Sequence, residues 1–315
     1  VIDVFYAIKN LSKAGVEIIL HCFQYGKRTQ QDELKRYCKE VFYYDRLTGI
    51  RGLDASLPYI ISSRRSIDLL SNLQKNEAPI LFEGLHTTYY VNHPVLADRT
   101  KLLRSHNIES EYYAALAGNA NNSFKKLYYS FEAGRLQRYE HLLTGFDRVL
   151  SISESDFAQH KIMYPSMHHS LIPAFHAHDE ISSLEGRGEY CLYHGNLSVE
   201  ENKRSVEYLI QRIFSRLDIK LIIAGKNPDD ALLAQAGEHI EIVANPDEVQ
   251  LNHLIQHAHI NVLPSFQQTG LKLKLLNALF LGRHCVVNQL SESSLTQTVH
   301  LAQQDDLLIH KIQDL

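Results

Sequence analysis

Short apolar runs of strand length alternate with helix-like segments along most of this 315-residue chain, and this alternation limits the fold more than any other feature. In the second half, "YCLYHG", "KLIIAG", "EIVAN" and "INVLPS" are strand-like, and a helical pattern follows each of them before "HCVVN". Strands that alternate with helices at this spacing predict parallel βαβ units. No GxGxxG motif follows any strand, so the dinucleotide fingerprint is absent.

The chain begins with a helical pattern rather than with a strand. Ile2, Phe5, Ile8 and Leu11 are spaced as on one helix face, and a buried strand, "VEIILHCF", follows Gly15. Doubly wound α/β folds open with a strand, so we expect that the first strand, and helices after the last strand, lie outside this chain. Farther on, we expect an extended segment at 57–63, a long helical region at 110–143 and a helix at 294–304.

A change of character between residues 164 and 188 suggests a domain connection. This stretch contains two prolines, four histidines and "EGRG". About two domains also fit the length, at roughly 150 residues each. We therefore predict an α/β architecture of two Rossmann-like domains that face each other across a cleft, with boundaries at 1–168 and 169–315.

Composition excludes several classes of function. The net charge of −4 gives no global basic footprint for nucleic acid. The apolar runs are too short for a membrane span. The four cysteines form no CxxC pair, which favours a reducing, cytoplasmic setting over a zinc site. Neither HExxH nor Asp-x-Asp occurs, so we expect no metal site.

The ordered landmarks of the second half carry a resemblance to a known family. "LYHGNLSVEENKRSVEYLI", "LIIAGKNP" and "INVLPSFQQTGLKLKLLNALFLGRHCVVN" occur in the order found in family-4-like GT-B glycosyltransferases (glycosyl transferases group 1) of the bacterial polysaccharide type. In the first half, "LLRSHNIESEYYAAL" and "FEAGRLQRYEHLLTGFDRVLSISESD" are similar to the acceptor domain of a subgroup. The resemblance implies transfer of a sugar from a nucleotide sugar, with retention at the anomeric carbon and without a metal cofactor.

The donor site is expected around the helix that follows Gly270. A helix N-terminus that ends a strand–glycine turn can bind a diphosphate through backbone N–H groups, and glycine allows close approach. Lys272 and Lys274 lie two positions apart and face different directions, and the resemblance favours Lys274. The candidate donor-binding residues are Gly195, Asn196, Lys226, Thr269, Gly270, Lys272, Lys274 and Asn277. Ordinary strand-to-helix turns and solvated surface lysines are the competing interpretation.

The acceptor side is expected just after a buried strand of the first half. By resemblance, His86 faces the sugar and is the candidate catalytic residue, since an imidazole can donate a hydrogen bond or carry a proton near neutral pH. A structural histidine is the alternative. Glu83, Arg104, His106, Asn107 and Glu109 are the candidate acceptor-binding residues. Asn107 and Glu109 would equally suit the start of a helix.

Departures from the family pattern leave the function open between two main alternatives. The family carries two glutamates eight positions apart, and these positions hold Thr269 and Asn277. The usual Arg and Lys after the first glycine fall at Asn196 and Glu201. The chain is thus either an active transferase or a non-catalytic GT-B-like partner protein with a degenerate donor site. A nucleotide-sugar epimerase is a third option, but no acid–base carboxylates stand at recognisable positions.

The expected partners are a nucleotide sugar and a glycan or lipid-linked acceptor. Peripheral association with the inner face of the membrane is left open, because some family members act on lipid-linked acceptors. No basic amphipathic face in the sequence requires it.

Overall fold

The computed structural model describes residues 2–24, 26, 30–120, 122–266, 273–290 and 295–315. It divides into two compact units, Val1–His176 and Ala177–Leu315. The division lies eight residues beyond the expected boundary at 168/169. The reason is that the strand His168–Leu171 pairs with Arg148–Ser151 of the first unit.

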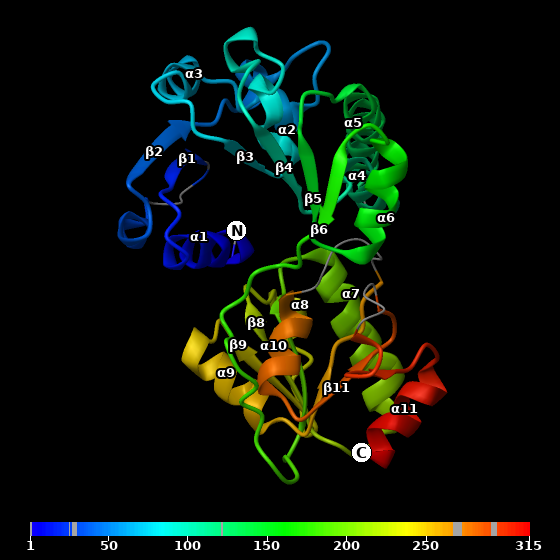
Figure 1. Cartoon of the computed structure of the whole chain (residues 1–315). Helices are drawn as coiled ribbons and strands as arrows, with labels where there is room; N and C mark the ends of the chain where they lie inside the picture. The colour runs from blue at the N-terminus through cyan, green and yellow to red at the C-terminus, as the bar shows by residue number, and fades with distance from the viewer. Residues whose placement is uncertain (1, 25, 27–29, 121, 267–272, 291–294) are drawn as a thin grey trace. The chain divides into compact units, whose positions relative to one another are not determined.

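The first unit contains short strands connected by helices (Figure 1). Its strands are β1 (Ile19–Gln24), β2 (Glu40–Asp45), β3 (Ile80–Glu83), β4 (Lys101–Ser105), β5 (Arg148–Ser151) and β6 (His168–Leu171). Its α-helices are α1 (Ile2–Lys13), α2 (Tyr59–Ser62), α3 (Ile67–Leu73), α4 (Glu109–Gly118), α5 (Ser123–Leu142) and α6 (Glu154–Met163). Its 3₁₀ turns are η1 (Asp32–Arg36), η2 (Gly49–Gly52), η3 (Leu85–Tyr90) and η4 (Pro94–Leu96).

All strand pairs of the first unit are parallel. The order β3-β4-β5-β6 forms one sheet, and β1 pairs with β2 in a second. The core of the four-stranded sheet includes Phe82, Leu103 and Val149, against which Leu136 of α5 packs. The carboxyl ends of β3, β4 and β5 therefore lie at one edge of this sheet, where Glu83 pairs with Arg104 and Ser105 pairs with Ser151.

The second unit is built around one sheet. Its strands are β7 (Cys191–Asn196), β8 (Leu221–Lys226), β9 (Ile240–Ala244), β10 (Ile260–Val262), β11 (His284–Val287) and β12 (His300–Leu301). Its α-helices are α7 (Glu200–Tyr208), α8 (Asp230–Leu233), α9 (Glu248–His257), α10 (Leu273–Leu281) and α11 (Asp305–Asp314). After α7 the chain continues as a π-helical turn, η5 (Leu209–Ile213), and a 3₁₀ turn, η6 (Phe214–Arg216).

The order of this sheet is β12-β11-β10-β7-β8-β9, with every pair parallel. In chain order this is the doubly wound arrangement in which β7 and β10 are neighbours at the centre. Successive residues of β7 and β8 enter different cores. Tyr193 and Ile223 pack with Leu209, whereas Leu192 and Ile222 pack with Ile255 of α9. Both faces are thus covered, which explains the nearly continuous apolar strands.

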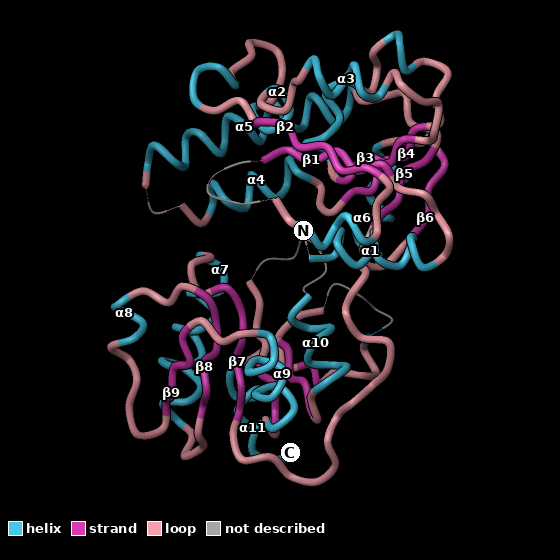
Figure 2. The backbone as a smooth tube through the Cα atoms, turned by 90° about the vertical axis from the view of Figure 1, so that its left-hand side faces the viewer, coloured by secondary structure: helices cyan, strands magenta, loops and turns pink. Residues whose placement is uncertain are grey.

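Some local expectations hold and others need correction. Ser153 caps α6, because its side chain accepts a hydrogen bond from the N–H of Asp156. The segment expected to be extended at 57–63 contains α2. The helical region at 110–143 is two helices, α4 and α5, which pack as a hairpin (Figure 2). The helix expected at 294–304 is instead β12 and a turn in its described part.

Two further observations concern the environment of the chain. Among the described residues, no helix is both long and apolar enough to cross a bilayer. Cys22, Cys38, Cys191 and Cys285 are free thiols, and three of them are buried. Burial raises the pKa of the Cys191 and Cys285 thiols to about 12, so both stay protonated at neutral pH.

Candidate donor and acceptor sites

The second unit has a topological switch point between β7 and β10. The chain turns to one side of the sheet after β7 and to the other after β10, as the strand order shows. Open α/β sheets bind ligands outside the carboxyl ends of the strands at such a point. Gly195 and Asn196 end β7, and Ser265 lies just after β10. The predicted donor residues of the β7 loop therefore border the switch point.

Lys274, near the start of α10, is tied to β7 and α7. Its Nζ donates to Tyr193 Oη and to Asn202 Oδ1, both at 3.0 Å, and lies 4.7 Å from the centre of the Tyr193 ring. Tyr193 Oη donates to the same Asn202 oxygen at 3.0 Å. Asn202 Nδ2 in turn donates to the carbonyl of Asn196 at 2.9 Å. These bonds hold an ammonium group beside the end of β7.

Two glycines let the β7 and β8 ends approach closely. A Cβ at Gly225 would lie 1.9 Å from the carbonyl oxygen of Gly195. A Cβ at Gly195 would lie 3.2 Å from Asn202 Nδ2. Gly195, a predicted donor-binding residue, therefore also leaves space for Asn202, which accepts a hydrogen bond from Lys274.

His194 lies beside this network and is almost fully buried, at 2% exposure. Burial, and then the charge of Lys274, lower its pKa to about 3. The imidazole is therefore neutral at physiological pH. Its Nε2 has no hydrogen-bond partner within the described residues, which is uncommon for a buried polar atom.

The other donor candidates have different surroundings. Asn196 Oδ1 accepts from the N–H and Oγ of Ser198, so its side chain closes its own turn. Lys226 ends β8 and is exposed. Asn277 Oδ1 lies 3.0 Å from His178 Nε2, whose ring stacks on Phe280. Thr269, Gly270 and Lys272 lie outside the described residues.

In the first unit, a buried arginine organises the acceptor candidates. Arg104 is 2% exposed and forms two hydrogen bonds with Asp3 of α1, at 2.7 and 2.8 Å. It also contacts Glu83 Oε2 at 3.3 Å, and His106 Nε2 lies 2.7 Å from that oxygen. Glu83, Arg104 and His106 are thus in contact with one another, and their binding of an acceptor stays a prediction. Arg104 is held inside the cluster and positions its neighbours.

His86 follows β3 on η3 and is partly buried. Its ring lies over Gly84, whose added Cβ would be 2.7 Å from His86 Cε1, and Gly84 has a φ of 85° that favours glycine. Burial, and then the charge of Arg64, lower the pKa of His86 to about 3. A neutral ring at pH 7 can exchange hydrogen bonds with a hydroxyl but does not act as a cation.

Glu109 and Asn107 lie at the start of α4. Burial, together with the nearby carboxylate of Glu140, raises the pKa of Glu109 to about 7. The capping alternative for Asn107 is not realised, because Ile108 is the N-cap and makes no side-chain cap. Glu109 and Glu111 lie in the first turn, where negative charge suits the helix dipole.

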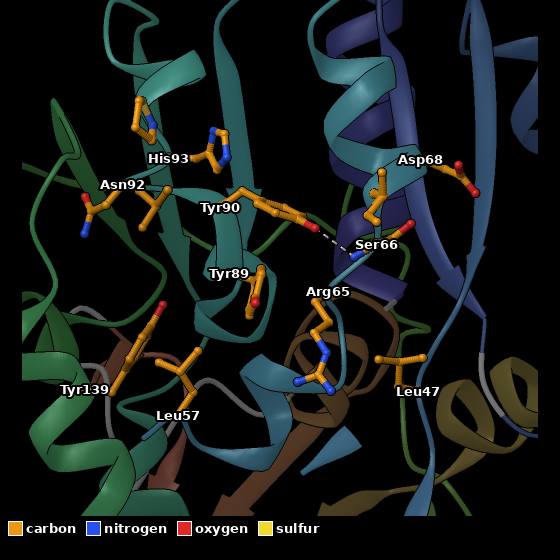
Figure 3. A pocket seen from close by; sticks show the side chains of 13 residues that line it. Leu47, Leu57, Arg65, Ser66, Asp68, Tyr89, Tyr90, Asn92, His93 and Tyr139 are labelled. Carbon is orange, nitrogen blue, oxygen red and sulfur yellow. Dashed lines mark hydrogen bonds between the residues drawn. The ribbon is translucent and has the colours of Figure 1, made fainter. Parts of the chain in front are cut away.

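A cavity of about 1130 Å³ lies elsewhere in the first unit, between η3 and the start of α3 (Figure 3). Tyr89, Tyr90 and His93 line one side, and Arg65 and Asp68 line another. No residue predicted from the sequence is among its lining residues. The candidate donor and acceptor sites are therefore defined by strand ends and side-chain contacts, and not by this cavity. In the described part of the chain, no group of three or more His, Cys, Asp or Glu side chains could hold a metal ion.

Residues 188–315 match the family described as Glycosyl transferases group 1. Over these residues the second unit is similar to glycosyl transferases group 1 proteins. A relative from Klebsiella pneumoniae, "Uncharacterized 44.6 kDa protein in cps region", is 28% identical over 299 residues, which cover 88% of this chain and 76% of that protein. The family supports sugar transfer as the class of activity.

Solved structures share the fold of both units. Sucrose-phosphate synthase from Thermosynechococcus elongatus matches 98% of this chain and 82% of its own, with a TM-score of 0.66 and 13% identity. UGT2 of Phytolacca americana matches 100% and 87%, with a TM-score of 0.55 and 11% identity. The chain spans only 50% of TarM, with a TM-score of 0.57 and 11% identity. The predicted GT-B class of two Rossmann-like units is thus confirmed.

Several residues of the two sites were not predicted from the sequence. Tyr193 and Asn202 were missed because their meeting with Lys274 depends on tertiary contacts. Asp3 was missed as well, although an arginine inside the strand "KLLRS" signals that a carboxylate must come from elsewhere. His178 had no signal of its own, since it sits among other histidines in the connection.

Proposed function

We propose that this chain transfers a sugar from a nucleoside-diphosphate sugar to a glycan or lipid-linked acceptor, without a metal ion and with retention at the anomeric carbon. One observation carries the proposal: the Lys274 ammonium group, held by Tyr193 and Asn202 at the switch point of a unit that is similar to glycosyl transferases group 1 proteins. A fixed cation at this place suits a diphosphate leaving group.

The departing diphosphate is the main chemical demand of the reaction. Lys274 supplies a positive charge, and the N-terminal end of α10 supplies a favourable dipole for an anion. His194 is neutral, and its buried Nε2 has no hydrogen-bond partner among the described residues. The lysine, and not a metal ion, would balance the charge that develops on the leaving group. Thr269, Gly270 and Lys272 stay donor-binding candidates by resemblance.

Acceptor binding is assigned to the carboxyl ends of β3 and β4. Glu83 and His106 share a hydrogen bond there and can receive sugar hydroxyls. His86, neutral at pH 7, is the candidate for a hydrogen bond to the reacting sugar. Glu109, whose pKa is about 7, can hold or release a proton near neutral pH.

Similar proteins support the donor class. The structure of UGT2 of Phytolacca americana contains UDP-2fluoro-glucose, and the pneumococcal O-GlcNAc transferase GtfA was solved in complex with UDP and GlcNAc. The Klebsiella relative belongs to a cps region, which fits polysaccharide synthesis. A cytoplasmic location, where nucleotide sugars are made, is part of the proposal.

A second candidate function is a non-catalytic partner protein with a degenerate donor site. Thr269 and Asn277 stand where the family resemblance places glutamates, and the Asn277 side-chain oxygen is already engaged by His178. Such a protein would bind nucleotide weakly or not at all and would turn over no donor.

Two measurements on the full chain separate these functions. We expect UDP or GDP to raise the melting temperature in a thermal-shift titration, with or without EDTA. We expect slow release of nucleotide from the matching nucleotide sugar in the presence of an acceptor glycan. Absence of stabilisation by every nucleotide tested would refute the donor site. Binding without turnover of any donor would favour the partner protein.

A further inference from the structure

The cavity between η3 and the start of α3 belongs to neither of the two candidate sites, and we call it the η3 cavity (Figure 3). All of its described lining residues lie in the first unit. Its volume of about 1130 Å³ exceeds the roughly 300–1,000 Å³ that is usual for small-molecule sites. The η3 cavity therefore has room for a ligand of several linked rings.

Three tyrosine rings line the η3 cavity, and hydrogen bonds hold two of them in place. Tyr90 Oη accepts a hydrogen bond from the backbone N–H of Ser66 at 3.1 Å. Tyr139 Oη lies 2.7 Å from Thr88 Oγ1 and donates to the Thr88 carbonyl at 3.3 Å. Tyr89 packs edge-to-face on Tyr90, with ring centres 4.8 Å apart. Because both hydroxyls are bonded to the protein, the rings present mainly apolar surface, and little side-chain freedom is lost when a ligand binds.

Polar side chains of the same lining complement the tyrosine rings. Asp68 and Asn92 are exposed and supply carboxylate and amide groups that can accept or donate hydrogen bonds. Arg65 also lines the cavity, but its guanidinium group is already engaged. Its Nη2 donates to the Arg51 carbonyl at 2.7 Å, and its Nη1 lies 3.8 Å from Asp54 Oδ2. The lining thus offers hydrogen-bonding groups without a net positive charge for an anion.

This combination disfavours two ligand classes and suits a third. A nucleoside diphosphate would bring its charge beside the Asp68 carboxylate, while Arg65 already pairs with Asp54. An acyl chain would cover Asp68 and Asn92 without offering them hydrogen bonds, which is costly. A sugar ring packs its C–H face on the negative face of an aromatic ring, and its hydroxyl groups both donate and accept hydrogen bonds.

We propose that the η3 cavity is a non-catalytic binding site for an uncharged oligosaccharide. The sugar rings stack on the tyrosines, and their hydroxyls bond to Asp68 and Asn92. No residue assigned to acceptor binding is among the described lining residues, so the two sites are distinct. The η3 cavity holds a part of a glycan that does not react. This binding stands apart from the proposed sugar transfer and does not require it.

Calorimetric titration of the full chain with linear hexasaccharides tests the proposal. The probes are maltohexaose, cellohexaose and β-1,4-mannohexaose, and we expect at least one of them to bind. The hexasaccharide should bind more tightly than the disaccharide of the same sugar, because the cavity has room for several rings. A hexamer of galacturonic acid should bind more weakly, because its carboxylates face Asp68. Absence of binding by all three neutral probes, or tighter binding of the acidic hexamer, overturns the proposal.

Two variants test the lining directly. Tyr89→Leu removes an aromatic face but keeps an apolar side chain in this partly buried position, and it should weaken hexasaccharide binding about fivefold. Asp68→Ala removes charge-assisted hydrogen bonds and should weaken binding at least about tenfold.

The matched controls lie outside the cavity. Tyr37 is partly buried and packs edge-to-face on Phe5, and Asp98 is exposed. Tyr37→Leu and Asp98→Ala should bind the hexasaccharide as the wild type does. Unchanged melting temperatures establish that each variant folds. Wild-type affinity in both Tyr89→Leu and Asp68→Ala overturns the proposal.

Two further variants separate the η3 cavity from the candidate donor and acceptor sites. Lys274→Met removes the cation of the donor site and should bind the hexasaccharide as the wild type does. A protein that binds the hexasaccharide but no nucleotide would therefore refute the sugar transfer and leave the η3 site standing. Loss of hexasaccharide binding in His106→Gln, with wild-type binding in Tyr89→Leu, would place the glycan at the acceptor candidates and overturn the proposal.

Discussion

The Nζ atom of Lys274 lies 3.0 Å from both Tyr193 Oη and Asn202 Oδ1, although these partners precede it by 81 and 72 residues. The lysine therefore joins α10 to the β7 strand end and to α7. In these two bonds its partners are a hydroxyl and an amide oxygen.

Replacement of Lys274 should weaken nucleotide binding. We expect Lys274→Met to raise the Kd for UDP by at least about tenfold, as a charge-assisted hydrogen bond is worth roughly 1.5–3 kcal/mol. Isothermal titration calorimetry measures the change. Lys272→Ala, at a residue outside the described part of the chain, should have a smaller effect, and Lys220→Ala, in an exposed pair with Glu241, should have none. Equal losses for Lys274→Met and Lys272→Ala would contradict the assignment.

The buried pair of Arg104 and Asp3 should matter far more for stability than an exposed pair. We expect Asp3→Asn to lower the free energy of unfolding by about 3–5 kcal/mol, because it leaves the buried charge of Arg104 with only its longer contact to Glu83. The exposed pair of Lys39 and Glu17 provides the control, and Glu17→Gln should cost about 0–1 kcal/mol. Urea denaturation followed by circular dichroism measures both. Similar costs would show that Arg104 is compensated by other groups.

A methyl group at Gly225 should be poorly tolerated. Its Cβ would meet the backbone oxygen of Gly195 at 1.9 Å, and backbone cannot move aside as a side chain can. We expect Gly225→Ala to cost at least about 2 kcal/mol. At Gly237 no atom lies within 4 Å of an added Cβ, so Gly237→Ala should change stability by less than about 0.5 kcal/mol. Thermal unfolding distinguishes the two, and equal melting temperatures would contradict the close approach of the strands.

His194 should make the protein less stable in mild acid. Its pKa is about 3 in the folded protein, from burial first and Lys274 second, and near 6.5 when unfolded. Between these values the unfolded chain binds a proton that the folded chain refuses. The contribution of His194 to the free energy of unfolding is therefore fully present above pH 6.5 and is lost as the pH drops toward 3.

From pH 7 to pH 5 this histidine should remove up to about 2 kcal/mol. The His194→Gln variant lacks the titrating group, so it should lose less stability than the wild type over the same interval. Urea unfolding at the two pH values measures the difference. An identical pH dependence in both proteins would show that the buried imidazole takes up its proton without unfolding.

The sequence predicted the regular part of the fold because its strands are apolar on both faces. β7, β8 and β11 were clear for this reason. β4 was not, because Arg104 interrupts it and becomes acceptable in a buried strand only through Asp3, 101 residues away. α2 was misread because a short apolar run such as "YIIS" suits either a strand or a helix.

The candidate sites were predictable to the level of strand ends. Parallel strands bring their carboxyl ends to one edge, so Glu83 with Arg104, and Gly195 with Asn196, could be placed from the pattern. Side-chain partners could not be placed, since Asn202 and His178 meet Lys274 and Asn277 only after the helices have packed.

The contact between Asp3 and Arg104 also bears on the order in which the first unit folds. It joins the first turn of α1 to the second strand of the β3–β6 sheet, so it closes a loop of about 100 residues and forms slowly. Until α1 packs against β4, the Arg104 side chain must stay hydrated and β4 cannot be buried. We expect the docking of α1 and the closing of this core to be one late, cooperative step of refolding.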